Sequence, residues 1–278
     1  MVPFVLTIAS ITLYVLSATL GVYAMVRKVD RVVLPSKAVF LAALVAQSVA
    51  IGINSVSTSG TLMSGPNIIM LAAWVLALVA FLLAAVGKRS HAFIAFAGPI
   101  AAVLIVASQV LGVLEAGASP SNEVYYEWPT LVLHVSLILL GTAAFAVSAS
   151  ASVMRVYQSE LMKRRSDRLL RIGMPAVSTL SAVARRAAMV GMTLFSAGIL
   201  IGLARFLALY AVMSAVDCEG SLLYLVPRMA LSLVVWAIYA VYLVLSYIFP
   251  YVGSSKLRAG FSIAGLVLAI VLIVVSAG

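Results

Sequence analysis

The sequence predicts an all-α polytopic membrane protein with eight transmembrane helices and both termini on the outer, non-cytoplasmic side. Hydrophobic residues make up 64% of the 278 residues and charged residues only 9%, and the mean hydropathy is +1.20. Eight apolar segments are separated by short polar ones, which is typical of membrane-spanning helices. Because there is no soluble domain and no convincing internal repeat, residues 1–278 are expected to form a single transmembrane domain.

The first four apolar segments occupy residues 4–25, 38–54, 67–86 and 92–114. The first has a basic cluster after it and none before it, which is the opposite of a cleavable signal peptide. It is therefore expected to begin outside. The second contains Gln47, and polar groups inside membrane helices usually make interhelical hydrogen bonds.

The fifth apolar segment begins at Trp128, contains His134 and leads into a strongly basic run that ends at Arg165. Residues 156–186 are expected to form a basic cytoplasmic loop with an amphipathic segment on the membrane surface. The sixth and seventh segments are expected at residues 187–213 and 226–249, separated by a polar loop at 214–221. The eighth follows the turn at 253–260 and ends the chain.

Positive charge is distributed between alternate pairs of segments. All Lys and Arg residues except Arg205 and Arg228 lie in or beside these alternate loops. The intervening loops carry acidic residues instead: Glu115, Glu123, Glu127, Asp217 and Glu219. This pattern predicts that the basic loops face the cytoplasm. It also explains the net charge of +10 by membrane orientation and attraction to anionic lipid, with no need for a nucleic-acid partner.

Three ionisable residues lie within the expected outer half of the membrane, namely His134, Arg205 and Arg228. Such residues are costly in hydrocarbon and are candidates for function. One imidazole and two guanidinium groups at similar depth could hold an amphipathic anion such as haem, with His134 on the iron and the arginines on the propionates. Alternatively, His134 bonds a backbone carbonyl and Arg205 pairs with Glu127, Asp217 or Glu219. No catalytic residues are expected.

The order of these features resembles the HemX/CcsA-type cytochrome c assembly family of integral membrane haem-handling proteins, with this chain as a divergent member. The Trp74 segment, the stretch LHVSLILLGTAAFA at residues 133–146 and the stretch VPRMALSLVVWAIYAVYL at residues 226–243 carry the resemblance. It implies eight spans and a haem-associated histidine at His134, with haem as the bound cofactor.

The chain departs from this family at several positions. Residues 214–224 contain no tryptophan, so the family's tryptophan-rich haem loop is missing, as it is in HemX-type proteins. Histidines that the resemblance leads one to expect are replaced by Gln47 and Pro227. The only other histidine, His91, falls in an inner turn, which excludes a bis-histidine haem within one chain. A second axial ligand could come from Met213 or Met229, and the sequence selects neither.

The resemblance implies a membrane protein of cytochrome c biogenesis that binds or presents haem near its outer face. It would bind and hand over haem without bond-making chemistry of its own. The alternative is a haem-free structural or accessory subunit of a membrane complex. Its partners would be membrane lipid and other proteins of a biogenesis or respiratory complex. Its location would be the plasma (inner) membrane of a prokaryote.

Overall fold

A computed structural model describes residues 2–27, 29–57, 65–86, 92–115, 129–164, 174–210, 215–249 and 254–277. Within these ranges all regular structure is helical, in eight helices: α1 (Val2–Arg27), α2 (Asp30–Ser57), α3 (Gly65–Val86), α4 (Ala92–Glu115), α5 (Pro129–Lys163), α7 (Val177–Tyr210), α8 (Ala215–Tyr247) and α9 (Ser255–Ala277). Each is long and apolar enough to cross a membrane. The predicted all-α polytopic fold is thereby confirmed, while the side on which the termini lie stays a prediction.

Three helices extend well beyond the apolar segments expected from the sequence. Helix α2 begins at Asp30, α7 at Val177 and α8 at Ala215, each about two to three turns before its apolar run. The expected polar loop at 214–221 is wrong for residues 215–221, which are helical. Hydropathy marks where a helix meets hydrocarbon, and a helix with polar residues can continue into water beyond that point.

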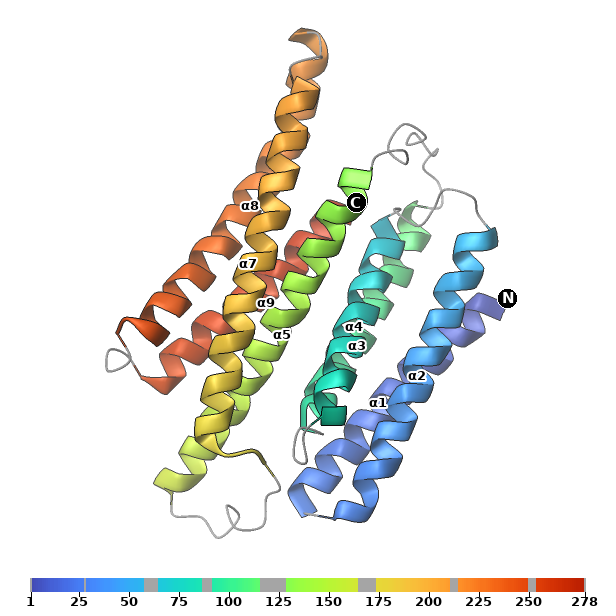
Figure 1. Cartoon of the computed structure of the whole chain (residues 1–278). Coiled ribbons are helices and arrows are strands. Elements are labelled where there is room, and N and C mark those ends of the chain that lie inside the picture. The colour runs from blue at the N-terminus through green and yellow to red at the C-terminus, as the bar shows by residue number, and fades with distance from the viewer. Residues whose placement is uncertain are drawn as a thin grey trace.

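The eight helices form two groups of four (Figure 1). In the first group α1 contacts α2 and α4, and α3 contacts the same two helices. In the second group α5 contacts α7 and α9, and α8 contacts the same two helices. Helices α3 and α4 of the first group touch α5, and α3 also touches α9. The same pairing scheme therefore recurs in both halves, although their sequences show no convincing repeat.

Buried polar side chains hold the first group together. The Tyr14 hydroxyl on α1 donates to Gln47 Oε1 at 2.7 Å, and Gln47 Nε2 donates to the Met70 carbonyl of α3 at 3.0 Å. Tyr14 and Gln47 are fully buried. Ser17 and Ser36 donate to each other's backbone carbonyls at 2.8 and 3.0 Å. The interpretation of Gln47 as an interhelical hydrogen-bonding residue is therefore confirmed.

Aromatic rings fill the core of the second group. The rings of Phe145 on α5 and Tyr239 on α8 stack with centroids 3.6 Å apart and planes 7° apart. The Tyr239 hydroxyl donates to the Ser262 carbonyl of α9 at 3.0 Å. Gly265 makes room for this ring, because a Cβ there would lie 2.5 Å from Tyr239 Cε2. Residues of α5, α8 and α9 are thereby fixed around one aromatic pair.

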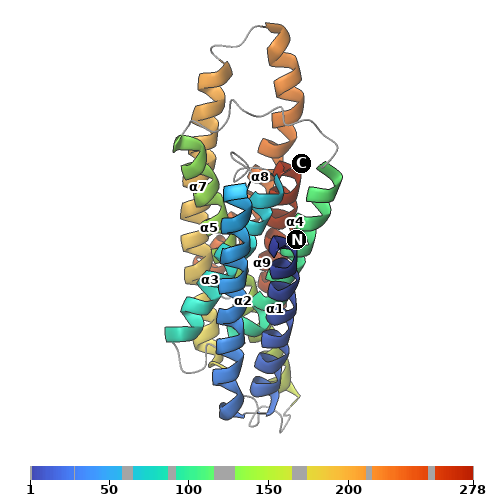
Figure 2. The same ribbon diagram turned by 90° about the vertical axis from the view of Figure 1, so that its right-hand side faces the viewer.

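The end of α7 and the beginning of α8 reach beyond the ends of the other helices in both views (Figure 1, Figure 2). The apolar span of α8 begins only at Val226, eleven residues after the helix begins at Ala215. At 1.5 Å per residue, the preceding part of α8 adds about 16 Å outside that span. The beginning of α8 therefore extends past the apolar span of this helix.

The Tyr14–Gln47 hydrogen bond predicts a specific loss of stability. The substitution Tyr14→Phe leaves a buried amide oxygen without its donor and is expected to lower the free energy of unfolding by about 0.6 to 1.7 kcal/mol. Tyr23→Phe is the matched control, because Tyr23 lies on the same helix and is 52% exposed. Thermal unfolding in detergent measures both variants. Equal stability of the two would contradict a structural role for this bond.

Candidate functional site

The predicted haem histidine lies where α5 and α7 pack together. These two helices contact each other more extensively than any other pair. A Cβ added at Gly202 would lie 2.6 Å from His134 Cε1, and one added at Gly198 would lie 2.8 Å from Ile138 Cδ1. Such distances are shorter than any van der Waals contact. The glycines therefore let the side chains of α5 rest directly on the backbone of α7.

The same close approach continues along both helices, toward the C-terminal end of α5. A Cβ at Gly141 would lie 3.2 Å from Phe195 Cβ, and one at Gly191 would lie 2.6 Å from Phe145 Cδ1. The contacts on α5 fall at residues 134, 138, 141 and 145, and those on α7 at 202, 198, 195 and 191. Both helices thus use the spacing four, three, four, with a large residue facing a glycine each time. Because the contacting residue numbers rise on α5 as they fall on α7, the two helices pack antiparallel in this register.

The sequence shows only half of this interface. Gly198 and Gly202 have the GxxxG spacing that suits close helix packing, but this spacing does not identify the helix that packs on them. The matching spacing of His134, Ile138, Gly141 and Phe145 was the available signal. It places His134 against the same two glycines, so the histidine and the glycine pair form one structural unit.

The hydrogen bond of His134 defines its tautomer. Its Nδ1 lies 2.6 Å from the Gly198 carbonyl oxygen. A carbonyl oxygen only accepts hydrogen bonds, so Nδ1 carries a proton; in the neutral ring Nε2 then has a lone pair for another partner. This bond is the one expected for a packing histidine. It is also the bond that orients histidines which ligate metals through Nε2.

Arg205 lies about one turn beyond Gly202, toward the C-terminal end of α7. It is half-buried, and its positive charge acts on the His134 imidazole. The same four-three spacing continues through Arg205, so Arg205 shares a face of α7 with Gly198 and Gly202. The acidic partners weighed for Arg205, namely Glu127, Asp217 and Glu219, lie outside the residues whose side chains the structure describes.

Arg228 reaches a similar level from α8. Trp236 Nε1 on α8 donates to Ser196 Oγ on α7 at 2.9 Å, which fixes the relative height of the two helices. From this contact Arg205 is nine residues along α7 and Arg228 is eight residues along α8. At 1.5 Å per residue these offsets are about 13 and 12 Å in the same direction. The two arginines therefore lie at comparable depth, near the level of His134.

Gln47 and Pro227, the residues at the positions of the expected family histidines, lie on α2 and α8. Gln47 uses both ends of its amide within the first group, so it is not available as a ligand. Pro227 is exposed on α8, and Met229, one of the two candidate second ligands, is half-buried. His91 and Met213 lie outside the described residues.

His134 is suited to a metal that brings most of its own ligands. Among the described residues no three His, Cys, Asp or Glu side chains gather as a metal site. A single imidazole is sufficient for haem iron, because the porphyrin supplies four nitrogen ligands. An apolar cavity of about 10 Å³ lies between the two groups of helices, lined by residues such as Leu76, Leu104 and Thr142. His134 does not line it, so the cavity belongs to the packing between the halves.

Comparison with known proteins identifies the family. Residues 62–276 match the family model described as cytochrome C assembly protein. The chain belongs to this family. No curated protein and no solved structure matches it. The match confirms the family resemblance seen in the sequence.

The cytochrome c assembly match includes α3 to α9 and leaves out α1 and α2. It therefore contains the whole α5–α7 interface with His134, Arg205 and the four glycines. Tyr14 and Gln47 fall outside it, which agrees with their role in packing. The histidine-bearing interface thus lies in the part of this cytochrome c assembly protein that is typical of its family.

The geometry of this family member predicts the protonation of His134 in the absence of haem. A chain labelled with ¹⁵N-histidine and carrying His91→Gln has one histidine signal, since there are two histidines in the chain. Its chemical shifts are expected to report protonated Nδ1 and unprotonated Nε2. Gly202→Ala, whose Cβ displaces the ring, is expected to abolish this pattern.

Gly52→Ala is the control for Gly202→Ala, because a Cβ at Gly52 meets nothing within 4 Å. It should leave the His134 signal unchanged. A spectrum with protonated Nε2 in the parent chain would show that the bond to Gly198 is absent.

Proposed function

We propose that this cytochrome c assembly protein is an integral membrane protein of cytochrome c biogenesis that binds or presents haem near its outer face. His134 would ligate the iron, and Arg205 and Arg228 would lie near the propionates. The observation that carries the proposal is the bond between His134 Nδ1 and the Gly198 carbonyl. It fixes the imidazole on α7 and leaves Nε2 as the ligating atom.

The charges near His134 support the same ligand. Haem is an apolar ring with two carboxylates at one edge. An imidazole on a helix surface with two guanidinium groups at similar depth matches that distribution. Haem would supply the iron porphyrin that cytochrome c requires. The residues of this chain would bind and orient it, with no bond-making chemistry of their own.

The distribution of basic residues supports an outer position for this site. His134 and Arg155 are 21 residues apart on α5, which is about 32 Å and close to the thickness of the hydrocarbon core. Arg155 belongs to the strongly basic end of the helices, which the positive-inside rule assigns to the cytoplasm. His134 and both termini would then lie outside. The corresponding location is the plasma membrane of a prokaryote.

A haem-free structural or accessory subunit is the second candidate. Two observations favour it: Gln47 is fully engaged in packing, and the bond of His134 to Gly198 also suits a histidine that only joins two helices. In either function the partners would be membrane lipid and other membrane proteins of a biogenesis or respiratory complex.

A difference spectrum separates these functions. The detergent-purified chain, reduced minus oxidised, is expected to show a Soret band after haem addition, and His134→Ala is expected to lose it. His91→Ala is the matched control and should retain the band. Arg205→Gln and Arg228→Gln should each weaken haem binding about tenfold or more, since each removes a charge-assisted hydrogen bond.

Absence of haem binding would favour the accessory-subunit function. If neither the parent chain nor His134→Ala binds haem while both remain folded, His134 is a packing residue and the chain is an accessory subunit. A band of equal intensity in both proteins would place the haem elsewhere.

A further inference from the structure

Trp236 makes a hydrogen bond between α8 and α7 in a part of the molecule that faces lipid. Its side chain is 40% exposed and lies within the apolar span of α8. Lipid offers no acceptor to an indole N–H, and Trp236 Nε1 instead donates to Ser196 Oγ at 2.9 Å. Neither residue belongs to the proposed haem site. Their bond nevertheless joins the helix that carries Arg228 to the helix that carries Arg205.

A second contact shows that α7 and α8 lie alongside each other in one register. The Arg185 guanidinium of α7 lies over the Tyr247 ring of α8, 5.3 Å from its centroid. Arg185 is eleven residues before Ser196, and Tyr247 is eleven residues after Trp236. Because the two offsets are equal and opposite in direction, the helices are antiparallel and keep the same relative height over about 16 Å.

The same register continues to the level of the two arginines of the proposed haem site. Arg205 is nine residues after Ser196 on α7, and Arg228 is eight residues before Trp236 on α8. Their levels therefore differ by about one residue, or about 1.5 Å. The sideways separation of α7 and α8 at this level then decides how far apart the two arginines lie.

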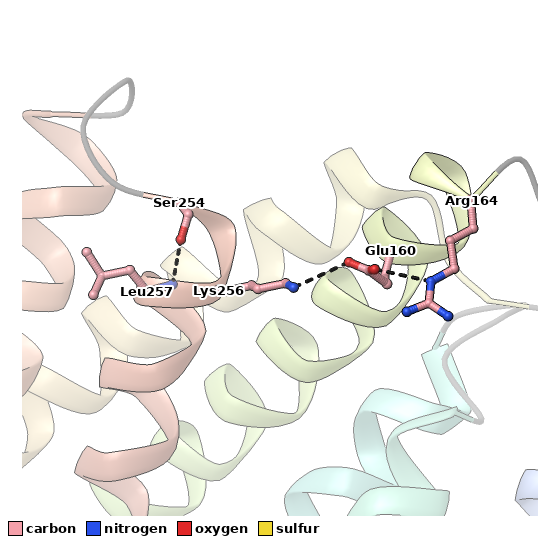
Figure 3. Close-up of polar contacts among 5 residues, drawn as sticks. All are labelled: Glu160, Arg164, Ser254, Lys256 and Leu257. Carbon is pink, nitrogen blue, oxygen red and sulfur yellow. Dashed lines mark hydrogen bonds and ion pairs between the residues drawn. The ribbon is translucent and has the colours of Figure 1, made fainter.

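The end of the second group away from His134 is held by contacts of other kinds. Lys256 Nζ at the start of α9 lies 3.4 Å from Glu160 Oε2 near the end of α5 (Figure 3). At the same end Arg185 of α7 lies over Tyr247 of α8. All four helices of the group are thereby joined there. If α8 moved away from α7, the movement would be largest at the opposite end, where the two arginines lie.

The part of α8 nearest Arg228 packs loosely. No side chain from residue 226 to residue 234 is buried, and Val235 is the first buried residue of the apolar span. Leu231 is only partly buried against the aromatic core. Packing therefore contributes little to holding this part of α8 in place. The hydrogen bond of Trp236 lies at the boundary between the packed and the loosely packed parts.

We propose that Trp236 and Ser196 are positioning residues of the haem site. Their hydrogen bond holds α8 beside α7, so that Arg228 lies close enough to Arg205 for both to bind the propionates of one haem. The bond acts through Arg228, since the packing of α5 on α7 already fixes Arg205 near His134. The inference rests on the proposed haem function and adds two residues to it that do not touch the haem.

The first group of helices provides a matched control. Trp74 Nε1 on α3 donates to Ser48 Oγ on α2 at 2.8 Å. The donor and the acceptor are the same as in the Trp236 bond, but neither helix carries a residue of the haem site. Trp74→Phe and Trp236→Phe therefore remove the same kind of bond, and only the second variant loosens the helices that carry the arginines.

Haem titration of the detergent-purified chain, followed by the Soret band, tests the positioning role. Trp236→Phe and Ser196→Ala should each bind haem about threefold to tenfold more weakly than the parent, as expected for the loss of one hydrogen bond in a membrane protein. The Soret maximum should stay at the parent wavelength, because His134 still ligates the iron. Trp74→Phe should bind haem as the parent does.

Combination with the arginine variants shows through which residue the bond acts. In an Arg228→Gln background, Trp236→Phe should weaken haem binding by less than about twofold, because the group that it positions is absent. In an Arg205→Gln background, Trp236→Phe should keep its full effect. A general loss of packing would instead weaken binding by the same factor in both backgrounds.

Spin labels measure the separation of α7 and α8 without haem. In a Cys218→Ser background, labels attached to Leu203→Cys on α7 and Ala230→Cys on α8 occupy exposed positions near the two arginines. The distance distribution between the labels should be narrow in this chain. Trp236→Phe should broaden it and lengthen its mean, and Trp74→Phe should leave it unchanged.

Failure of the positioning role and failure of the haem function give different results. A label distance that Trp236→Phe leaves unchanged would overturn the positioning role, whether or not haem binds. A full effect of Trp236→Phe in the Arg228→Gln background would overturn it as well, while the haem function would stand. A parent chain that binds no haem would overturn the haem function, and with it the role of this bond in haem binding, even if the label distance responds to Trp236→Phe.

Discussion

The close packing of α5 on α7 is the constraint on which the functional part of this structure depends. Membrane helices gain little from the hydrophobic effect, because lipid is as apolar as their side chains, so close backbone approach supplies the attraction. Glycines at 191, 198 and 202 allow that approach on α7. The approach brings His134 within hydrogen-bonding distance of Gly198. Removing one methyl-sized space would therefore disturb both the packing and the histidine.

This interface connects two opposite ends of the molecule. One end carries His134 with Arg205 beside it, and the other carries Arg155 on α5 and Arg185 on α7. The first arrangement has a neutral ring that can ligate a metal and charges that suit carboxylates. Because both lie on the same rigid helix pair, the register that positions one end also positions the other.

The sequence predicted the eight membrane helices because hydropathy and alternating loop charge report directly on contact with lipid and water. It did not predict where α7 and α8 begin, because polar residues such as Asp217 can continue a helix outside the membrane. It singled out His134 and Arg205 because ionisable groups are rare in hydrocarbon. It could not identify the partner of His134, since that depends on which helix packs on Gly198.

Disulfide formation between α5 and α7 tests the central claim most directly. In a Cys218→Ser background, which removes the only cysteine of the chain, Gly141→Cys is combined with Phe195→Cys. A Cβ at Gly141 would lie 3.2 Å from that of Phe195, close to the separation found in disulfides, so rapid cross-linking is expected. Gly141→Cys with Gly202→Cys, displaced by about 10 Å along α7, should not cross-link. Efficient cross-linking of the second pair and not of the first would show that the helices pack in another register, and His134 would then not lie against Gly198.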